Sequence, residues 1–380
     1  MWFLPILFFL SPILFVLTGV NVNDPIYGLF VLCLGLRPLK GDRISFPRNL
    51  IAISLTFFIL IACGIGVGFF NGYQSSIIFT EALYYLKPVI FLLYGYFYLN
   101  ETSFNKLTFF GFWIVVIGSL VYFSNPPFFI EKAIEKAHEV QGVGHFYAIH
   151  HTMLRNSSLL LSPLETGYVL FFMTSYLYAY KPFKHPNFYF IVSASLLVLT
   201  YTRSVIIGFI LAFVLFKLLE ANVIKKIYFL FLFIIIAIFV GIIYLNQLAL
   251  IFIQDGSAVL HLRNLTEGVW VILDRPFGYG IGYSGFGSLQ STTDKFYSEG
   301  SFFTSIIENG ILFLFFYICI FFYLNQVSRN KLLPIYLGFL TASMLIPIGF
   351  STIFNCLFFS YLGIIIKREK STETDSSSNS

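Results

Sequence analysis

Three arginines in the second half of the chain have the type and spacing that could hold a phosphorylated ligand. Arg203 lies between two apolar runs in LTYTRSVIIGF, and Arg263 and Arg275 lie at the two ends of RNLTEGVWVILDR. Each guanidinium group offers a planar fork of donors that matches phosphate oxygens, so the three side chains together could bind a diphosphate. Contact of the same arginines with lipid headgroups is the alternative, and the sequence leaves it open.

The segment that carries Arg263 and Arg275 has the pattern of an amphipathic helix followed by a tight turn. Apolar residues recur there at near-helical spacing, which predicts a helix at a membrane surface that ends at Pro276. The alternating glycines of GYGIG, at 278–282, then permit a tight turn and a close approach of two backbones. No strand or βαβ unit precedes these glycines, so the run is not a dinucleotide-binding fingerprint.

The elements that position these residues must lie in a lipid bilayer. The chain has 380 residues, of which 58% are hydrophobic and 11% are charged, and its mean hydropathy is +0.84. A soluble domain has roughly 45–50% apolar and about 25% charged residues, so the excess must face lipid. The apolar run at 2–20 has no basic start and no small-residue cleavage site, which favours a retained span over a signal peptide.

Long apolar stretches recur from end to end and predict one all-α, polytopic integral membrane domain over residues 1–367. A helix needs about 20 apolar residues to cross the hydrocarbon layer. On this criterion we expect about twelve spans, at residues 2–20, 26–38, 50–70, 79–99, 107–124, 164–180, 188–201, 205–220, 227–246, 302–324, 332–350 and 352–367. The polar tail at 368–380 is expected to be disordered and cytoplasmic.

The distribution of lysine and arginine predicts that both termini are cytoplasmic. The segment RPLKGDRISFPR, at 37–48, carries dense basic charge, and basic connections stay on the inner side. Two long connections, at roughly 125–163 and 247–301, then lie on the outer side, and EKAIEKAHE in the first predicts a helix at the water boundary. The same topology places Arg203 at the outer face, where a charge in so short a turn runs against the insertion bias.

Neither a metal site nor a disulfide is expected. The four cysteines lie inside apolar runs, without a partner at metal-ligand spacing. His145, His150 and His151 lie close together in the first long connection, but no acidic or cysteine partner stands at a supporting spacing. We therefore expect a function that needs no cofactor.

Three blocks of the chain, TRSVIIGF, LRNLTEGVWVILDRPFGYGIGYSGFG and SEGSFFTSIIENGI, resemble the shared pattern of bacterial O-antigen polymerases and O-antigen ligases. The resemblance covers residues 199–310 and lies in the order of the blocks and in their topology. In the third block, ligases resemble one another in having a histidine nine residues before the glutamate, whereas this chain has Glu299 at that distance from Glu308. This departure favours the polymerase branch over the ligase branch.

The resemblance implies a GT-C-like glycosyltransferase of the bacterial inner membrane that needs no metal and no nucleic acid. Its donor and acceptor would be oligosaccharides linked to undecaprenyl diphosphate, joined at the periplasmic face among membrane lipids; a chain-length regulator is a further candidate partner. Arg203, Arg263 and Arg275 would stabilise the negative charge on the departing diphosphate. Glu299 would take the proton of the attacking hydroxyl as general base.

Other charged residues have open roles. Glu299 could be an ordinary solvated acid of its loop, and Glu308 could orient an arginine or pair with a buried donor. Glu165 stands where the helix dipole favours a first-turn acid. Lys87 lies inside a span, where phosphate or Glu81 could be its partner.

Two other functions remain open. Transfer of the finished glycan to lipid A core would use the same donor with a different acceptor, as the ligases do. A lipid-linked oligosaccharide flippase belongs to another class, the transporters, which often carry internal repeats and interrupted helices. The chain has no convincing internal repeat, and its candidate charges gather at one face, so we favour the polymerase.

Overall fold

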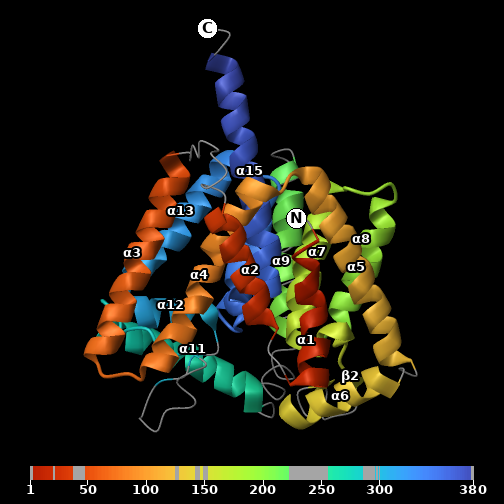
Figure 1. Cartoon of the computed structure of the whole chain (residues 1–380), viewed down its shortest axis with the longest axis horizontal. Helices are drawn as coiled ribbons and strands as arrows, with labels where there is room; N and C mark the ends of the chain where they lie inside the picture. Colours follow the sequence, from red (N-terminus) through yellow and green to blue (C-terminus); the bar gives the residue numbers. More distant parts are fainter. Residues whose placement is uncertain are drawn as a thin grey trace, which may run out of the picture. The chain divides into compact units, whose positions relative to one another are not determined.

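The computed structural model in Figure 1 describes residues 3–19, 22–36, 48–124, 128–141, 146–148, 153–221, 256–285, 296, 298 and 300–377. Within these ranges the chain is helical apart from one antiparallel pairing of β1 (Tyr147–Ala148) with β2 (Met153–Leu154). This confirms the all-α class that the hydropathy pattern predicts.

The chain forms two compact units. The first comprises Met1–Leu55, Tyr84–Ile206 and Ile348–Ser380, and the second comprises Thr56–Leu83 and Ile207–Pro347. The first unit contains α1 (Ile6–Thr18), α2 (Asn23–Leu36), α5 (Glu101–Phe123), α6 (Phe128–Gln141), η3 (Ser158–Leu160), α7 (Pro163–Tyr180), α8 (Pro186–Val198), η5 (Ile348–Phe350) and α15 (Thr352–Ser377). The second contains α11 (Gly256–Asp274), α12 (Ser301–Asn309), α13 (Leu312–Val327) and α14 (Leu332–Ser343). The units share α3 (Arg48–Phe70), α4 (Ser75–Tyr98) and α9 (Arg203–Glu220).

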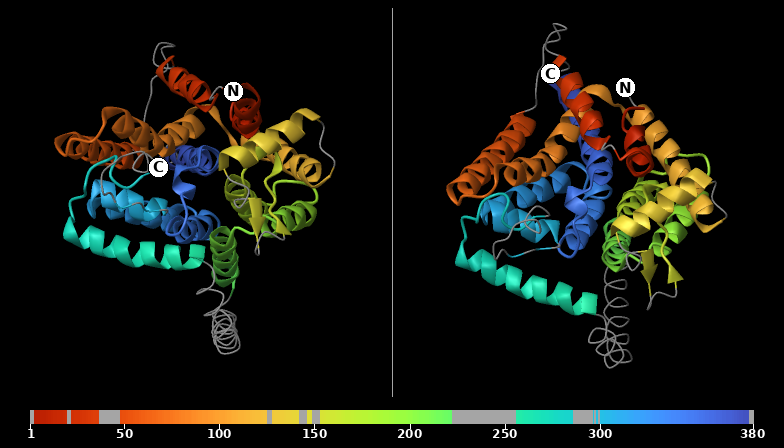
Figure 2. Two further views of the ribbon diagram at one scale, coloured as in Figure 1. Left: turned by 90° about the horizontal axis from the view of Figure 1, so that it is seen from below. Right: turned by 60° about the horizontal axis from the view of Figure 1, so that its bottom comes forward.

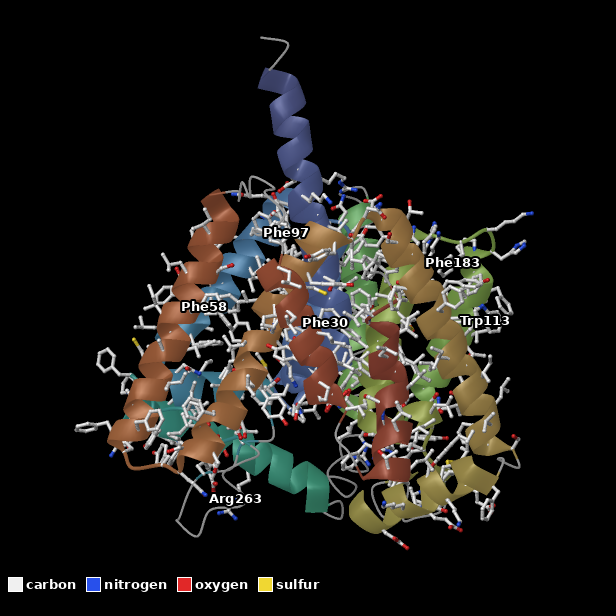
Figure 3. The ribbon with its side chains drawn as sticks, viewed as in Figure 1. Phe30, Phe58, Phe97, Trp113, Phe183 and Arg263 are labelled. Atoms are coloured by element: carbon white, nitrogen blue, oxygen red, sulfur yellow. The ribbon has the colours of Figure 1, made fainter. Side chains whose placement is uncertain are left out.

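Aromatic packing and close backbone contact hold the first unit together. Phe30 of α2 is fully buried, and its ring centroid lies 5.5 Å from that of Phe8 and 4.4 Å from that of Tyr94 (Figure 3). A Cβ on Gly95 of α4 would lie 1.9 Å from the carbonyl oxygen of Ser360, so α4 and α15 touch through their backbones. Because a buried large apolar side chain stabilises a fold by roughly 1.5–3 kcal/mol, these contacts fix the helices that carry the charged residues.

The outer faces of many helices are apolar. Phe70, Leu120 and Ile191 are 91%, 65% and 60% exposed, and Figure 3 shows Phe58 on the outer side of α3. Exposed apolar surface on this scale marks contact with something other than water, and lipid chains fit it.

Two helices in the described part of the chain, α4 and α5, are long and apolar enough to cross a bilayer. The shorter apolar helices there are Ile6–Thr18, Asn23–Leu36, Ser54–Phe70, Pro186–Val198, Leu312–Val327 and Leu332–Ser343. Helix occupies most of each predicted span in the described residues, whereas the span at 227–246 lies outside them. The number of about twelve spans stays a prediction.

Three predicted segments differ from the structure. The run at 332–350 is α14, which ends at Ser343, followed by a turn and η5. The apolar run at 302–324 is two helices, α12 and α13, because Gly310 between them adopts a φ of 82°. The tail continues α15 as a helix to Ser377, well past residue 368, where we expected disorder to begin. The stretch after Gly363 contains no glycine or proline to end the helix.

Amphipathic helices occupy both long connections, as predicted. In the first unit, α6 packs against α1 and lies crosswise at its end (Figure 1). In the second, α11 packs against α12 and lies crosswise to α13, as Figures 1 and 2 show. A helix in this orientation suits a membrane surface better than a membrane interior.

Candidate functional site

The chain after α11 makes a turn that favours glycine. Gly278, Gly280 and Gly282 have φ angles of 90°, 90° and 97°, which side chains disfavour. A Cβ on Gly280 would lie 2.3 Å from the backbone nitrogen of Gly68 in α3, and one on Gly278 would lie 2.6 Å from the carbonyl oxygen of Glu308 in α12. The tight turn predicted from GYGIG is therefore confirmed, and it packs backbone to backbone against both helices.

The side chain of Glu308 anchors this turn. Its Oε1 atom accepts hydrogen bonds from the backbone N–H groups of Gly282, Ser284 and Gly285, at 3.0, 3.0 and 3.2 Å. Glu308 is only 1% exposed, and a buried carboxylate is costly without such donors. Of the two roles that the sequence left open for Glu308, pairing with buried donors is confirmed, and the donors are backbone amides.

Arg275 lies exposed over a stack of tyrosine rings. Its guanidinium carbon is 4.8 Å from the centroid of Tyr279, whose ring stacks on Tyr283 at 4.2 Å and 12°. The Tyr279 hydroxyl donates to Asp274 Oδ2 at 2.6 Å. Partial burial, together with this hydrogen bond, raises the pKa of Tyr279 to about 12. The hydroxyl therefore stays protonated near neutral pH, and the cation–π contact sets the direction of Arg275.

Arg263 has a partner in its own helix. Its Nε atom donates to Glu267 Oε1 at 2.5 Å, and the Arg263 side chain is largely exposed on the outer side of α11 (Figure 3). This hydrogen bond raises the pKa of Arg263. The helix begins at Gly256, so Arg263 lies within it, because the helical pattern continues upstream through GSAVLHL. Arg263 and Arg275 are about 18 Å apart along the helix axis.

Arg203 is the first residue of α9, and the connection before it is strained. Tyr201 has a φ of 49°, a value that is uncommon for residues with a side chain. The Thr202 backbone N–H donates to Thr200 Oγ1 at 3.3 Å and stabilises this conformation. The exposed guanidinium group sits at a helix N-terminus, where the helix dipole opposes a positive charge by about 0.3–1 kcal/mol.

Arg155, from the first long connection, lies beside Arg203. Its Nε atom donates to the carbonyl oxygen of Thr200 at 2.9 Å, and its Nη2 atom donates to Thr202 Oγ1 at 3.0 Å. Burial lowers the pKa of Arg155, and the positive charge of Arg203 lowers it further. Sequence reasoning missed this residue, because its only signal was a basic side chain in an outer connection.

The connection that holds both arginines is tied to the first turn of α7. Thr202 Oγ1 donates to the carbonyl oxygen of Pro163 at 3.4 Å. Ser162 caps α7 by accepting a hydrogen bond from the backbone N–H of Glu165 at 3.4 Å. The N-termini of α7 and α9 therefore lie together, and each presents the positive end of its dipole. Two such ends beside two guanidinium groups form a place that favours an anion.

The first turn of α7 also carries Glu165, which is linked to a lysine. Ser351 Oγ donates to Glu165 Oε2 at 2.6 Å, and Lys87 Nζ donates to Thr352 Oγ1 at 2.7 Å. Lys87 and Glu165 attract each other electrostatically. The Lys87 ammonium group lies 4.1 Å from the centroid of the Tyr84 ring. The first-turn position expected for Glu165 is confirmed, and the contacts of Lys87 are with Thr352 and Tyr84.

Lys87, Arg155 and Arg203 gather around the first turn of α7, and we call them the cationic cluster. All three belong to the first unit, whereas Arg263 and Arg275 belong to the second. The structure thus pairs Arg203 with Arg155, a residue that we did not select from the sequence. No family model, curated protein or solved structure matches the chain. The chemistry of the cationic cluster therefore carries the functional assignment.

The predicted general base, Glu299, lies outside the described residues, as do His145, His150 and His151. Of its neighbours, Ser298 is 6% exposed, and a Cβ on Gly300 would lie 2.2 Å from the carbonyl oxygen of Met344. The role of Glu299 stays a prediction. Among the described residues, no group of three or more histidine, cysteine, aspartate and glutamate side chains is placed to hold a metal ion.

Proposed function

We propose that the chain is a polymerase of the bacterial inner membrane that joins oligosaccharide repeat units carried on undecaprenyl diphosphate. The reaction takes place at the periplasmic face, in a GT-C-like membrane domain with about twelve spans and both termini in the cytoplasm. The apolar outer faces of the helices support the membrane setting. The resemblance of residues 199–310 to O-antigen polymerases and ligases supports the choice of reaction.

The observation that carries the proposal is the contact of Arg155 and Arg203 with the joined N-termini of α7 and α9. Two guanidinium groups that repel each other, beside two positive helix ends, favour the binding of an anion. A diphosphate has at least two negative charges and oxygens that match both guanidinium forks. A lipid-linked diphosphate brings that anion to the outer membrane face, where the predicted topology places Arg203.

The proposed chemistry is a single displacement at an anomeric carbon. The acceptor hydroxyl oxygen forms a bond to this carbon while the bond from the carbon to the diphosphate oxygen breaks, and its electron pair leaves with the diphosphate. Arg155 and Arg203 stabilise the charge that develops there, and Arg263 and Arg275 keep their predicted roles as further ligands. The proton of the acceptor hydroxyl passes to Glu299, the predicted base.

The test is complementation of a strain in which the gene is deleted, read on a gel of the surface glycan. Arg203→Lys and Arg155→Lys keep the charge but lose the planar fork, and we expect about 10- to 100-fold less polymer, the effect of one or two charge-assisted hydrogen bonds. Arg368→Lys is the matched control, because Arg368 pairs with Glu101 at 2.6 Å on an exposed surface. Normal polymer length from well-expressed Arg203→Lys and Arg155→Lys variants would overturn the proposal.

The deletion itself separates the alternatives. Loss of a polymerase leaves lipopolysaccharide capped with a single repeat unit, whereas loss of a ligase leaves bare core. Loss of a flippase leaves no exported repeat at all. Bare core or absent repeats would therefore replace the polymerase with the corresponding alternative.

A further inference from the structure

Lys87 is a charged residue in the middle of α4, a helix that is long and apolar enough to span a membrane. Ionisable groups at such positions are costly and are commonly retained for function. The half-buried ammonium group donates to Thr352 Oγ1 and lies over the Tyr84 ring. These contacts hold Lys87 in one place without neutralising its charge.

The hydroxyl partner of Lys87 belongs to a helix N-terminus. Thr352 is the first residue of α15, and Ser351 before it caps the helix by accepting a hydrogen bond from the backbone N–H of Phe354 at 3.2 Å. Lys87 thus lies at the positive end of α15, in the same way that Arg203 lies at the positive end of α9. Glu165, in the first turn of α7, is joined to Ser351 and so connects the two groups of cations.

The first turn of α7 lies between Lys87 and the two arginines of the cationic cluster. Glu165 attracts Lys87, and Asp24 at the start of α2 adds a weaker attraction, whereas Arg155 and Arg203 repel each other. An anion that approaches Arg155 and Arg203 also approaches the first turn of α7, to which Glu165 belongs. Its oxygens could then take the place of the Glu165 carboxylate as the counter-charge of Lys87.

We propose that Lys87 is a third cation of the diphosphate site, and that Glu165 is a positioning residue that balances the charge of Lys87 until a substrate phosphate takes over that role. This inference rests on the proposed function. Thr352 aims the ammonium group through its hydrogen bond, and Ser351 holds Glu165 next to it. No bond is made or broken by either residue in this step.

The competing explanation is that Lys87 and Glu165 are an electrostatically coupled pair with a purely structural role. Removing one partner of such a pair is strongly destabilising, whereas replacing both by neutral side chains is often tolerated. A structural pair therefore predicts that Lys87→Met combined with Glu165→Gln restores every property of the protein. A substrate site predicts that the same double variant regains stability but not ligand affinity.

The experiment measures binding of undecaprenyl diphosphate to the full chain in lipid nanodiscs, together with thermal stability. We expect Lys87→Met alone to be unstable, and the double variant to recover wild-type stability with at least tenfold weaker binding. Lys87→Arg keeps the charge and should bind within a few-fold of wild type. The control pair, Arg368→Met with Glu101→Gln, removes an exposed ion pair and should leave binding unchanged. Wild-type affinity in the double variant would overturn the inference.

Two further readouts keep the result decisive. If the double variant fails to reach the membrane, Thr352→Val removes the Lys87 hydrogen bond at constant size and charge, and unchanged affinity would overturn the inference. Polymer formation by the wild type separates this inference from the proposed function. If binding depends on Lys87 but the wild type forms no polymer, the polymerase is rejected and the role of Lys87 in the site is kept. If the wild type forms polymer but binding does not depend on Lys87, the polymerase is kept and this inference is rejected.

Discussion

At the scale of single residues, the side chain of Glu308 accepts hydrogen bonds that a backbone carbonyl would accept in a regular helix. One of its oxygen atoms accepts from three amide groups of the glycine turn, and its own carbonyl oxygen accepts from the Gly280 N–H at 2.9 Å. A turn in which alternate residues have positive φ angles cannot make the regular hydrogen bonds of a helix. A single buried carboxylate satisfies these donors instead, and Arg275 and Tyr279 depend on the turn that it holds.

Replacement of Glu308 by alanine should therefore destabilise the second unit. Three buried N–H groups lose their acceptor, and we expect a loss of about 3 kcal/mol or more in the free energy of unfolding. Glu308→Gln keeps an acceptor oxygen and should lose less. Thermal unfolding of the purified protein in detergent measures the effect. Glu267→Ala, which removes a partly exposed carboxylate paired with Arg263, is the control, and an equal loss in both variants would contradict this account.

A second prediction at this scale concerns Glu299. Glu299→Gln keeps the size of the side chain but removes the proton acceptor, and we expect about 10²- to 10⁴-fold slower polymerisation. Binding of the lipid-linked donor should be retained, so the loss should appear in kcat and not in KM. Glu135→Gln, on the exposed side of α6, is the control. Normal polymerisation by Glu299→Gln would remove this residue from the site.

At the scale of elements, the break between α12 and α13 is what brings Glu308 to the turn. Gly310 has a φ of 82°, and the next N–H group, of Ile311, donates to the carbonyl oxygen of Pro276 at 2.7 Å. An uninterrupted helix would use that donor internally and would leave the turn without this contact. The helix break at Gly310 and the glycine turn therefore form one structural motif.

Gly310→Ala should destabilise this motif. A Cβ there would lie 2.6 Å from the Phe277 carbonyl carbon, and alanine disfavours the positive φ, so we expect a destabilisation of about 1–3 kcal/mol. Gly66→Ala in α3 is the matched control, because a Cβ there meets nothing within 4 Å and alanine favours a helix. Comparison of the two unfolding midpoints measures the difference. Equal midpoints would show that the positive φ carries no strain.

At the scale of the whole molecule, the first unit has two ends that the topology assigns to opposite sides of the membrane. α6 follows α5 in the first long connection, and the short connection at 181–185 follows the other end of α7. A helix of 18 residues, such as α7, is about 27 Å long, which is close to the hydrocarbon thickness. The positive-inside rule places α6 outside and the connection at 181–185 inside.

Cysteine labelling tests this orientation. In a background without native cysteines, Lys136→Cys in α6 should react with a membrane-impermeant maleimide added outside the inner membrane. Lys184→Cys should react only after that membrane is permeabilised. The two substitutions lie on exposed or partly exposed polar segments of the same unit, so each controls for the other. The reverse pattern would place the cationic cluster on the cytoplasmic side and would reject the periplasmic reaction.

The sequence by itself determined the helical class, most helix boundaries, the amphipathic helices of the two connections and the turn at GYGIG. These features follow from hydropathy, helical period and the backbone freedom of glycine, which are properties of neighbouring residues. Only the tertiary structure decided that Arg203 is joined by Arg155 and that Glu165 is linked to Lys87. Those contacts join positions far apart in the sequence, Arg155 with Thr202 and Lys87 with Thr352, and they depend on how whole helices pack. Local patterns predict that a charge lies inside a membrane span, but the packing of helices determines which residue is its partner.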